Sequence, residues 1–351
     1  MTVPFTMQAV LLTGHGGFEQ LSFRDDVPTP VPLVDEVLIR VTAAAVNNTD
    51  INMRVGWYSK DAERSGQVEK DSGWTGGRVT FPLIQGADAC GYIAAIGPGV
   101  EAARLGQRVL VDPVLRATRA GCAAMPRYLG SDCDGAFADY VCVPARNAFP
   151  VDSSLSDAEL AAVPCTFTAA ENMLARADVR AEDIVLITGA SGGVGSAAVQ
   201  LAKRRGARII AVADESKAAQ LLELGASRVL PRDAELATAL GKESVDAVID
   251  VVGGREFAQL LEVLRRGRRY AVAGAIAGPL VTLDLRTLYL KDLQLLGCTI
   301  PDAAAFGNIV RYIENGEVRP VVSATYALRA IAEAQRAFLA KKHFGKIVVL
   351  P

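Results

Sequence analysis

The stretch Asp183-Ile-Val-Leu-Ile-Thr188-Gly189-Ala190-Ser191-Gly192-Gly193-Val194-Gly195 decides the fold. Its first six residues predict a buried strand, and a helix then opens with Ser196-Ala-Ala-Val-Gln. Gly192 would let the backbone approach a pyrophosphate, and Gly195 would let the helix pack closely on the strand. The helix N-terminus would offer free N–H groups to the anion. Because tight turns also use glycine without any ligand, the surrounding pattern must decide between the two readings.

That surrounding pattern alternates helices with strands from Asp157 onward. Continuous runs of Val, Ile and Ala are typical of strands buried on both faces of a parallel sheet. The six predicted strands are 183–188, 208–213, 228–230, 245–251, 269–273 and 293–299. Helices are predicted at 194–205, 217–224, 257–264 and 285–290. The alternation predicts a doubly wound α/β domain and favours dinucleotide binding by the glycine loop.

Residues up to about 150 follow a different pattern. Short apolar runs separated by Gly and Pro turns predict a β-rich barrel or sandwich. Two polar stretches, 59–80 and 116–135, are predicted to be long surface loops. After Pro301 the pattern predicts helices at 305–315 and 328–341 and a final strand at 346–350.

Composition narrows the class of protein. The 351 residues predict about two domains. Lys and Arg number 37 against 39 Asp and Glu, so the chain lacks the basic excess that nucleic acid would favour. We find no apolar run of the roughly 18 residues that a membrane span needs and no signal peptide, and expect a cytoplasmic protein. Only two histidines are present, which argues against most His-based triads and His-rich metal sites.

Motifs in both halves resemble the medium-chain dehydrogenase/reductases, in particular their zinc-independent quinone oxidoreductase branch. The N-terminal motif is Ala45-Val-Asn47-Asn-Thr-Asp50-Ile-Asn-Met-Arg54-Val-Gly56-Trp-Tyr58. The second half contributes the glycine loop, Asp250-Val-Val-Gly-Gly254 and Gly345-Lys-Ile347. The resemblance covers nearly the whole chain. It implies a GroES-like catalytic domain (1–155 and 301–351), a Rossmann domain (156–300), an active site in the cleft between them and a homodimer.

The resemblance also bears on metal binding. Zinc-dependent alcohol dehydrogenases of this superfamily hold catalytic zinc through a Cys, a His and a second Cys, and the corresponding positions here are Asn47, Ala87 and Cys165. A catalytic zinc needs about three protein ligands, so we expect no zinc. Without a Lewis acid, hydride transfer to a quinone or an α,β-unsaturated carbonyl is easier than alcohol oxidation. The alternatives are an alcohol dehydrogenase, zinc-free or with a rearranged metal site, and a non-catalytic nucleotide-binding structural or sensor protein.

Four residues of the N-terminal motif are candidate catalytic residues. We expect Asn47 beside the nicotinamide and the substrate, Asp50 to orient its neighbours, and Tyr58 to line the acceptor pocket. Asn52 stands where the family frequently has a substrate-contacting tyrosine, which allows water to be the proton donor. Trp74, in the first polar stretch, is expected either to cover the substrate cleft or to anchor its loop on the barrel.

The choice of cofactor depends on the end of the second predicted strand. A carboxylate there binds the ribose 2′-OH of NAD, whereas a small residue near cations accommodates NADP. The strand 208–213 places Ala213 there and points Asp214 away, with Lys217 and Arg232 as phosphate partners. We therefore expect NADPH, although a shift of one residue in register would restore Asp214 as an NAD-type acid. The resemblance implies further cofactor contacts from Asn47, Thr168, Ser191, Gly192, Gly193, Val194, Val252, Gly274, Ala275, Ile276 and Lys346.

Overall fold

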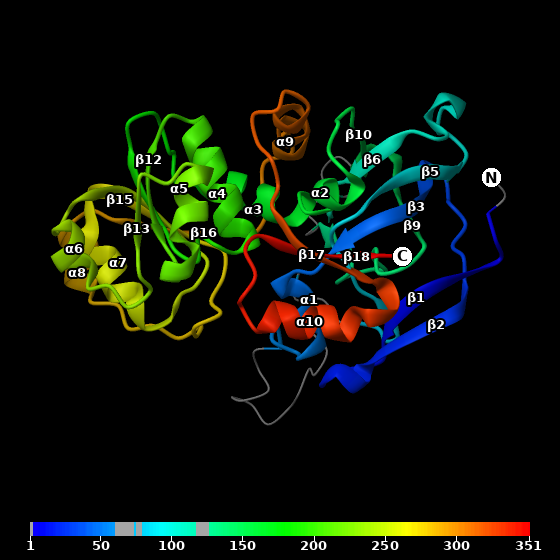
Figure 1. Cartoon of the computed structure of the whole chain (residues 1–351), viewed down its shortest axis with the longest axis horizontal. Coiled ribbons are helices and arrows are strands. Elements are labelled where there is room, and N and C mark those ends of the chain that lie inside the picture. Colours follow the sequence, from blue (N-terminus) through cyan, green and yellow to red (C-terminus); the bar gives the residue numbers. More distant parts are fainter. Residues whose placement is uncertain (1–2, 60–73, 75–78, 117–125) are drawn as a thin grey trace. The chain divides into compact units, whose positions relative to one another are not determined.

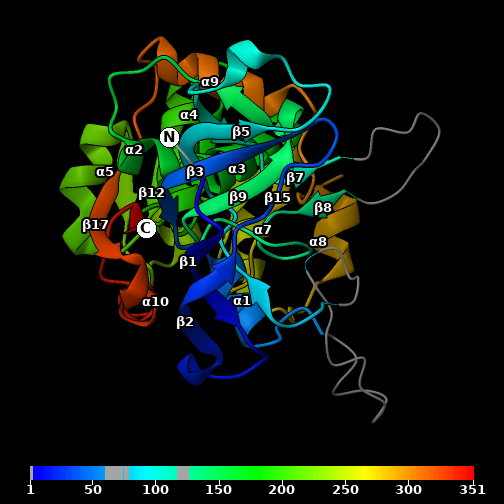
Figure 2. The same cartoon turned by 90° about the vertical axis from the view of Figure 1, so that its right-hand side faces the viewer.

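The computed structural model describes residues 3–59, 74, 79–116 and 126–351, which form two compact units (Figures 1 and 2). The first unit comprises residues 1–165 and 322–351, and the second comprises residues 166–321. The second domain was expected to span residues 156–300, so both of its observed boundaries lie later in the chain than expected. Most of the predicted loop 59–80 and part of the predicted loop 116–135 lie outside the described residues.

The first unit is built on a sheet in the order β10-β6-β5-β3-β18-β17, with β9 also paired to β3. Its strands are β3 (Glu36–Ala45), β5 (Cys90–Ile96), β6 (Arg108–Val111), β9 (Tyr140–Pro144), β10 (Ala148–Pro150), β17 (Val322–Ala327) and β18 (Lys346–Leu350). A smaller sheet has the order β2-β1-β4, formed by β1 (Thr6–Leu12), β2 (Leu21–Pro28) and β4 (Leu83–Ile84), and β7 (Val114–Leu115) pairs with β8 (Arg127–Tyr128). Since β18 pairs antiparallel with β3, the C-terminal strand reaches the start of the 45–58 motif.

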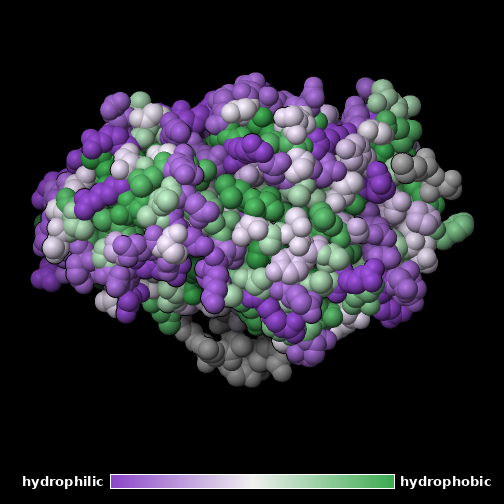
Figure 3. All heavy atoms as spheres, in the orientation of Figure 1, coloured by the Kyte–Doolittle hydropathy of each residue, from purple (hydrophilic) through white to green (hydrophobic). Residues whose placement is uncertain are grey.

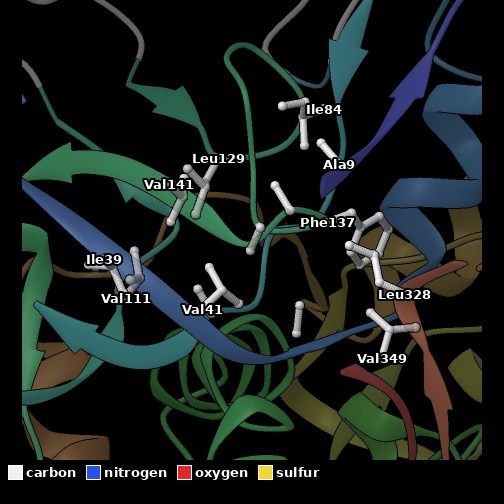
Figure 4. Packing of buried hydrophobic residues seen from close by; sticks show 14 of the residues in the cluster. Ala9, Ile39, Val41, Ile84, Val111, Leu129, Phe137, Val141, Leu328 and Val349 are labelled. Atoms are coloured by element: carbon white, nitrogen blue, oxygen red, sulfur yellow. The ribbon is translucent and has the colours of Figure 1, made fainter. Parts of the chain in front are cut away.

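The core of this unit follows from strand alternation. On β3 the side chains of Val37, Ile39 and Val41 belong to one buried cluster, as expected for residues two apart on a strand. Figure 4 shows the ring of Phe137 beside Leu328, which lies in the 3-10 helix η7 (Leu328–Ala330). The packing around Phe137 is close, because a Cβ at Gly86 would come within 2.8 Å of its ring.

The second unit contains the predicted parallel sheet. Its order is β13-β12-β11-β14-β15-β16, and every pair is parallel. The strands are β11 (Ile184–Ile187), β12 (Arg208–Val212), β13 (Arg228–Leu230), β14 (Val245–Asp250), β15 (Leu264–Val272) and β16 (Gln294–Gly297). This confirms an α/β fold with a β-rich first unit and a doubly wound, six-stranded second unit. The chain runs outward from β11 in one direction and then returns to β14, so the strand order reverses between β11 and β14.

Helices complete both units (Figure 1). The first unit has α1 (Asn48–Arg54), α2 (Asp157–Ala161) and α10 (Ile331–Leu339). The second has α3 (Pro164–Arg176, apart from its first two residues), α4 (Gly193–Arg204), α5 (Ala218–Leu224), α6 (Leu236–Leu240), α7 (Phe257–Val263), α8 (Leu285–Leu290) and α9 (Ala305–Glu314). The sequence analysis placed α9 with the GroES-like domain. In the structure the segment after α9 is tied to α4, because Arg319 N donates to Gln200 Oε1 (2.8 Å) and Arg204 pairs with Glu317.

The surface drawn in Figure 3 mixes hydrophilic and hydrophobic residues. Among the described residues, no helix has both the length and the apolar character needed to span a bilayer.

Candidate functional site

A buried polar network lies where β3 ends and α1 begins. Asn47 is the N-cap of α1, and its backbone N–H donates to Asp50 Oδ2 in the first helical turn (2.7 Å). The side chain of Asn47 donates from Nδ2 to Ala45 O (3.1 Å) and to Asp88 Oδ2 (2.9 Å). Its Oδ1 accepts from Lys346 Nζ on β18 (2.5 Å). Asn47 therefore bridges a carboxylate and an ammonium, and both hydrogens of its amide nitrogen are used within the protein.

Asp88 and Lys346 form the charged part of this network. Their side chains are 0% and 4% exposed, and Lys346 Nζ lies 2.9 Å from Asp88 Oδ2. Lys346 also donates to Val46 O (2.9 Å), so all three of its N–H bonds have protein acceptors. The other oxygen of Asp88 accepts from Cys165 N (2.6 Å). Such complete pairing is what a buried ion pair requires.

Asp50 is a second buried carboxyl beside this pair. Only 1% of the residue is exposed, and its own carbonyl accepts from Gln85 Nε2 (2.8 Å). Burial raises the pKa of Asp50 to about 7, opposed by the Asn47 N–H bond and the charge of Lys346. The carboxyl therefore changes its protonation state near neutral pH.

A hydroxyl cluster lies on α1 and the turn after it. Tyr58 donates from its hydroxyl to Thr49 Oγ1 (3.3 Å) and accepts from Asn52 Nδ2 (3.4 Å). Burial raises the pKa of Tyr58, so the phenol stays protonated at neutral pH. The sequence analysis missed Thr49, although it lies within the quoted motif between Asn47 and Asp50. Because the hydroxyl hydrogen of Tyr58 is used by Thr49, the hydroxyl of Thr49 is the one that can donate to an oxygen of a bound molecule.

The last part of the first unit's site is aromatic. Tyr128, on β8, is 6% exposed and donates from its hydroxyl to Cys165 Sγ (3.2 Å). Trp74 stacks on the Tyr128 ring with centroids 4.3 Å apart, and Trp74 N donates to Ser131 Oγ (3.1 Å). These two contacts hold Trp74 against Tyr128 and Ser131.

In the second unit, the glycine loop joins β11 to α4 as predicted. Gly192 is the N-cap of α4, whose first turn has N–H groups without intrahelical acceptors. A Cβ at Gly195 would lie 2.3 Å from Gly189 O, so the helix can pack here only with glycine. Thr168 on α3 has a buried Oγ1 that makes no hydrogen bond to any of the described residues. A phosphate-binding helix terminus and an unpartnered hydroxyl fit a dinucleotide.

The end of the second strand matches the expected register. β12 ends at Val212, Ala213 is 1% exposed, and Ala213 N still donates to Leu230 O (3.1 Å). Asp214 is exposed and caps the following turn, accepting from Ser216 N (3.1 Å) and Ser216 Oγ (2.6 Å). These bonds lower the pKa of Asp214, and the charges of Arg232 and Lys217 lower it further.

Two more loops follow the adjacent strands. Residues 251–254 follow β14, and residues 274–277 follow β15. A Cβ at Gly274 would lie 2.6 Å from Val251 O, and Ala277 N donates to Val252 O (2.9 Å). The structure thus brings together the loops that contain the expected contacts Val252, Gly274, Ala275 and Ile276.

Family models match both units. The model of the alcohol dehydrogenase GroES-like domain matches residues 34–153, and that of the zinc-binding dehydrogenase matches residues 193–315. A crystal structure from Sinorhizobium meliloti 1021, whose assignment as an alcohol dehydrogenase is provisional, is 47% identical with a TM-score of 0.93. That similarity covers 99% of this chain and 98% of the other. The chain is a medium-chain dehydrogenase/reductase.

Three further members of the superfamily are similar over nearly their whole length. An NAD-dependent alcohol dehydrogenase of known structure is 33% identical with a TM-score of 0.88, covering 98% of this chain and 100% of that one. Acryloyl-coenzyme A reductase of Metallosphaera sedula is 29% identical, covering 98% of this chain and 99% of the relative. Quinone oxidoreductase of Rattus norvegicus is 26% identical, covering 98% of both.

The zinc-ligand positions of this medium-chain dehydrogenase/reductase offer a poor donor set. Ala87 has no donor atom in its side chain, and the amide nitrogen of Asn47 is bound to Asp88 and Ala45. Cys165 has a thiol whose pKa burial raises to about 12, and its Sγ accepts a hydrogen bond from Tyr128, so one thiol is left among the three positions, fewer than the three protein ligands that a catalytic zinc needs. These side chains do not fit a catalytic zinc.

The expected site residues fall into two groups. In the first unit the structure brings together Asn47, Asp50, Asn52, Tyr58 and Lys346. In the second, Ser191, Gly192, Gly193 and Val194 form the glycine loop, and the charges of Lys217 and Arg232 act on Asp214. Tyr128 was not among the expected site residues, and Asp88 was considered only as a possible ligand of a rearranged metal site. The only signal for Asp88 was its position after Ala87, where the family's zinc enzymes have a glutamate.

Proposed function

We propose that this enzyme transfers a hydride from NADPH to a quinone or an α,β-unsaturated carbonyl without zinc. The observation that carries the proposal is the network of Asn47, Asp88 and Lys346, whose donors and acceptors bind one another at the position where zinc enzymes hold the metal. Similarity to a quinone oxidoreductase and to an acryloyl-coenzyme A reductase supports this class of acceptor.

The hydroxyl cluster supplies the polar contact that such an acceptor needs. Bound NADPH would supply the hydride, which leaves negative charge on the acceptor oxygen. Thr49 accepts from Tyr58, so the hydroxyl hydrogen of Thr49 is free to point at that oxygen. Asn52 donates to Tyr58 and orients it. In this scheme Asn47 caps the N-terminus of α1, Tyr58 donates to Thr49, and Thr49 donates to the acceptor oxygen or passes it a proton from water.

NADPH is proposed over NADH because of the end of β12. Ala213 leaves space at the position that distinguishes the two cofactors, and Asp214 already accepts two bonds from Ser216. We propose that Lys217 and Arg232, whose charges act on Asp214, balance a 2′-phosphate.

An assay of cofactor oxidation tests the proposal. Purified enzyme should oxidise NADPH with quinones, enones and enoyl thioesters, faster than NADH, and prolonged treatment with a chelator should leave the rate unchanged. Stoichiometric zinc that is lost together with activity would contradict the proposal and restore Cys165 as a ligand.

The second candidate is alcohol oxidation, which similarity to an NAD-dependent alcohol dehydrogenase favours. The same preparation should be tested with NAD and a panel of primary and secondary alcohols. Alcohol oxidation with NAD, and no acceptor-dependent oxidation of NADPH, would make this the better description.

We further propose a homodimer formed through the edge strand β16. Large apolar residues are exposed on β16, on α8 and in the segment before α8: Ile276, Leu280, Val281, Leu285, Tyr289, Leu290 and Leu295. A second copy would cover this apolar surface. Light scattering should give twice the chain mass, and Leu290→Glu should give the monomer mass. A monomeric wild-type protein would contradict the proposal.

A further inference from the structure

We propose that Asp250, held by Thr188 and Tyr270, is a positioning residue for the nicotinamide end of the cofactor site. The inference rests on the proposed use of NADPH. It concerns the second unit alone, where the three residues come from the ends of β11 and β14 and from β15.

Asp250 accepts an unusual number of hydrogen bonds for a residue with 0% exposure. Its Oδ1 accepts from Thr188 Oγ1 (2.5 Å), Val252 N (2.8 Å) and Gly253 N (3.1 Å). Its Oδ2 accepts from Gly253 N (3.2 Å) and from the hydroxyl of Tyr270. Two hydroxyls and two backbone amides therefore surround this carboxylate, and no ion pair to it is found among the described residues.

The bonds tie the ends of three neighbouring strands to one another. Thr188 follows β11 and precedes the glycine loop, and its Oγ1 also accepts from Val251 N (3.1 Å). Tyr270 extends from β15, next to β14 in the sheet. Ala273 N donates to the backbone carbonyl of Asp250 (3.1 Å). A displacement of the Asp250 carboxylate would therefore shift the ends of all three strands.

Three loops lie directly on this centre. A Cβ at Gly189 would lie 3.0 Å from the side chains of both Val251 and Val252, so the glycine loop contacts the loop 251–254. A Cβ at Gly274 would lie 2.6 Å from Val251 O, so the loop 274–277 contacts it as well. These contacts leave little room for one loop to move without the others.

The position of the centre explains why it would matter for the cofactor. In an open α/β sheet, ligands bind outside the carboxyl ends of the strands where the strand order reverses, and here that is between β11 and β14. The phosphates belong at the N-terminus of α4, so the loops after β14 and β15 are left for the nicotinamide. Burial and the charge of Asp250 raise the pKa of Tyr270, which keeps its hydroxyl a donor at every working pH.

Tyr270→Phe is the test, because it removes one donor to Asp250 and leaves the ring in the core. Binding is measured by calorimetry with NADPH and with ADP-ribose 2′-phosphate, which lacks only the nicotinamide. We expect the dissociation constant for NADPH to rise about tenfold, because the loops after β14 and β15 would lose part of the support that holds them in the binding conformation. That for the fragment should change less than about twofold. Thr188→Val should behave in the same way, and Thr188→Ser should restore binding.

Tyr312→Phe, a hydroxyl deletion on α9 of the same unit, is the matched control and should bind both ligands as wild type does. Equal losses for NADPH and the fragment, accompanied by a lower melting temperature, would show that the centre is only structural and would overturn the inference. Unchanged binding of both would overturn it too. Failure of the wild-type protein to bind NADPH would instead reject the proposed function.

Discussion

Each unit contains a carboxylate that is completely buried, and the two carboxylates are stabilised in opposite ways. Asp88 in the first unit and Asp250 in the second are both 0% exposed. Asp88 is paired directly with the ammonium of Lys346, and the side chain of Asn47 is hydrogen-bonded to both. Asp250 is surrounded by hydroxyls and backbone amides at the ends of parallel strands.

The difference shows what each arrangement can tolerate. An ion pair depends on a single counter-charge, so removing that charge leaves the whole cost of burial on the other partner. A carboxylate held by several neutral donors loses only a part of its stabilisation when one donor is removed. We therefore expect the first unit to be the more sensitive to single substitutions and the second to respond mainly through its loops.

The largest expected effect breaks the ion pair. Lys346→Met should lower the free energy of unfolding by about 3–5 kcal/mol, because Asp88 would be buried without its counter-charge. Urea unfolding measures the loss, and the exposed Lys342→Met should stay within about 0.5 kcal/mol of wild type. A loss below about 1 kcal/mol would show that Asp88 is reached by water, and the contrast with Asp250 would fail.

Asp50 adds a third case to the comparison of buried carboxyls, because it is buried without a full ion pair. Its pKa is raised to about 7, so the folded state holds a proton that the unfolded state has already released. Stability should therefore fall as pH rises from about 4 to about 7, by a few kcal/mol in total, and stay level above that. Asp50→Asn should remove this part of the slope and be more stable than wild type at pH 8.

The exposed Asp25→Asn provides the control for Asp50, and its stability should follow the wild-type pH curve. Denaturant unfolding at pH 5, 6, 7 and 8 makes the measurement. If the Asp50→Asn curve runs parallel to the wild-type curve, Asp50 is ionised throughout this range and its proposed protonation is wrong.

The next, smaller effect concerns exposed charged side chains near the proposed cofactor site. Arg232→Ala should weaken NADPH binding by roughly 1.5–3 kcal/mol, the range for a bond between charged groups, and leave NADH binding nearly unchanged. Asp214→Ala serves as the opposite test in calorimetry, because removal of this carboxylate should not weaken NADPH. A specific loss of NADH affinity in Asp214→Ala would instead identify Asp214 as an NAD-type acid.

Sequence reasoning succeeded where the chain pattern is local. The parallel sheet and the glycine loop follow from apolar runs and from the turn between β11 and α4, and β13 and β18 have the predicted bounds. The link between Lys346 and Asn47 is not local, because it depends on β18 pairing with β3 across some 300 residues. The same holds for Asp88, and for α9, whose amphipathic pattern fits a face of either unit. Contacts made by folding at such separations leave no periodic signal in the sequence.

The smallest expected effect concerns a contact without charge. Trp74 stacks on the buried ring of Tyr128, and such a pair contributes about 0.5–1.5 kcal/mol. Trp74→Ala should therefore lower the free energy of unfolding by about 1 kcal/mol and leave kcat/KM for the acceptor within about twofold of wild type. Trp57→Ala, at a tryptophan that is 42% exposed, should lower stability less. If kcat/KM for the acceptor changes while stability and NADPH affinity do not, Trp74 covers the substrate, and its stacking on Tyr128 is a property of the free enzyme that the acceptor displaces.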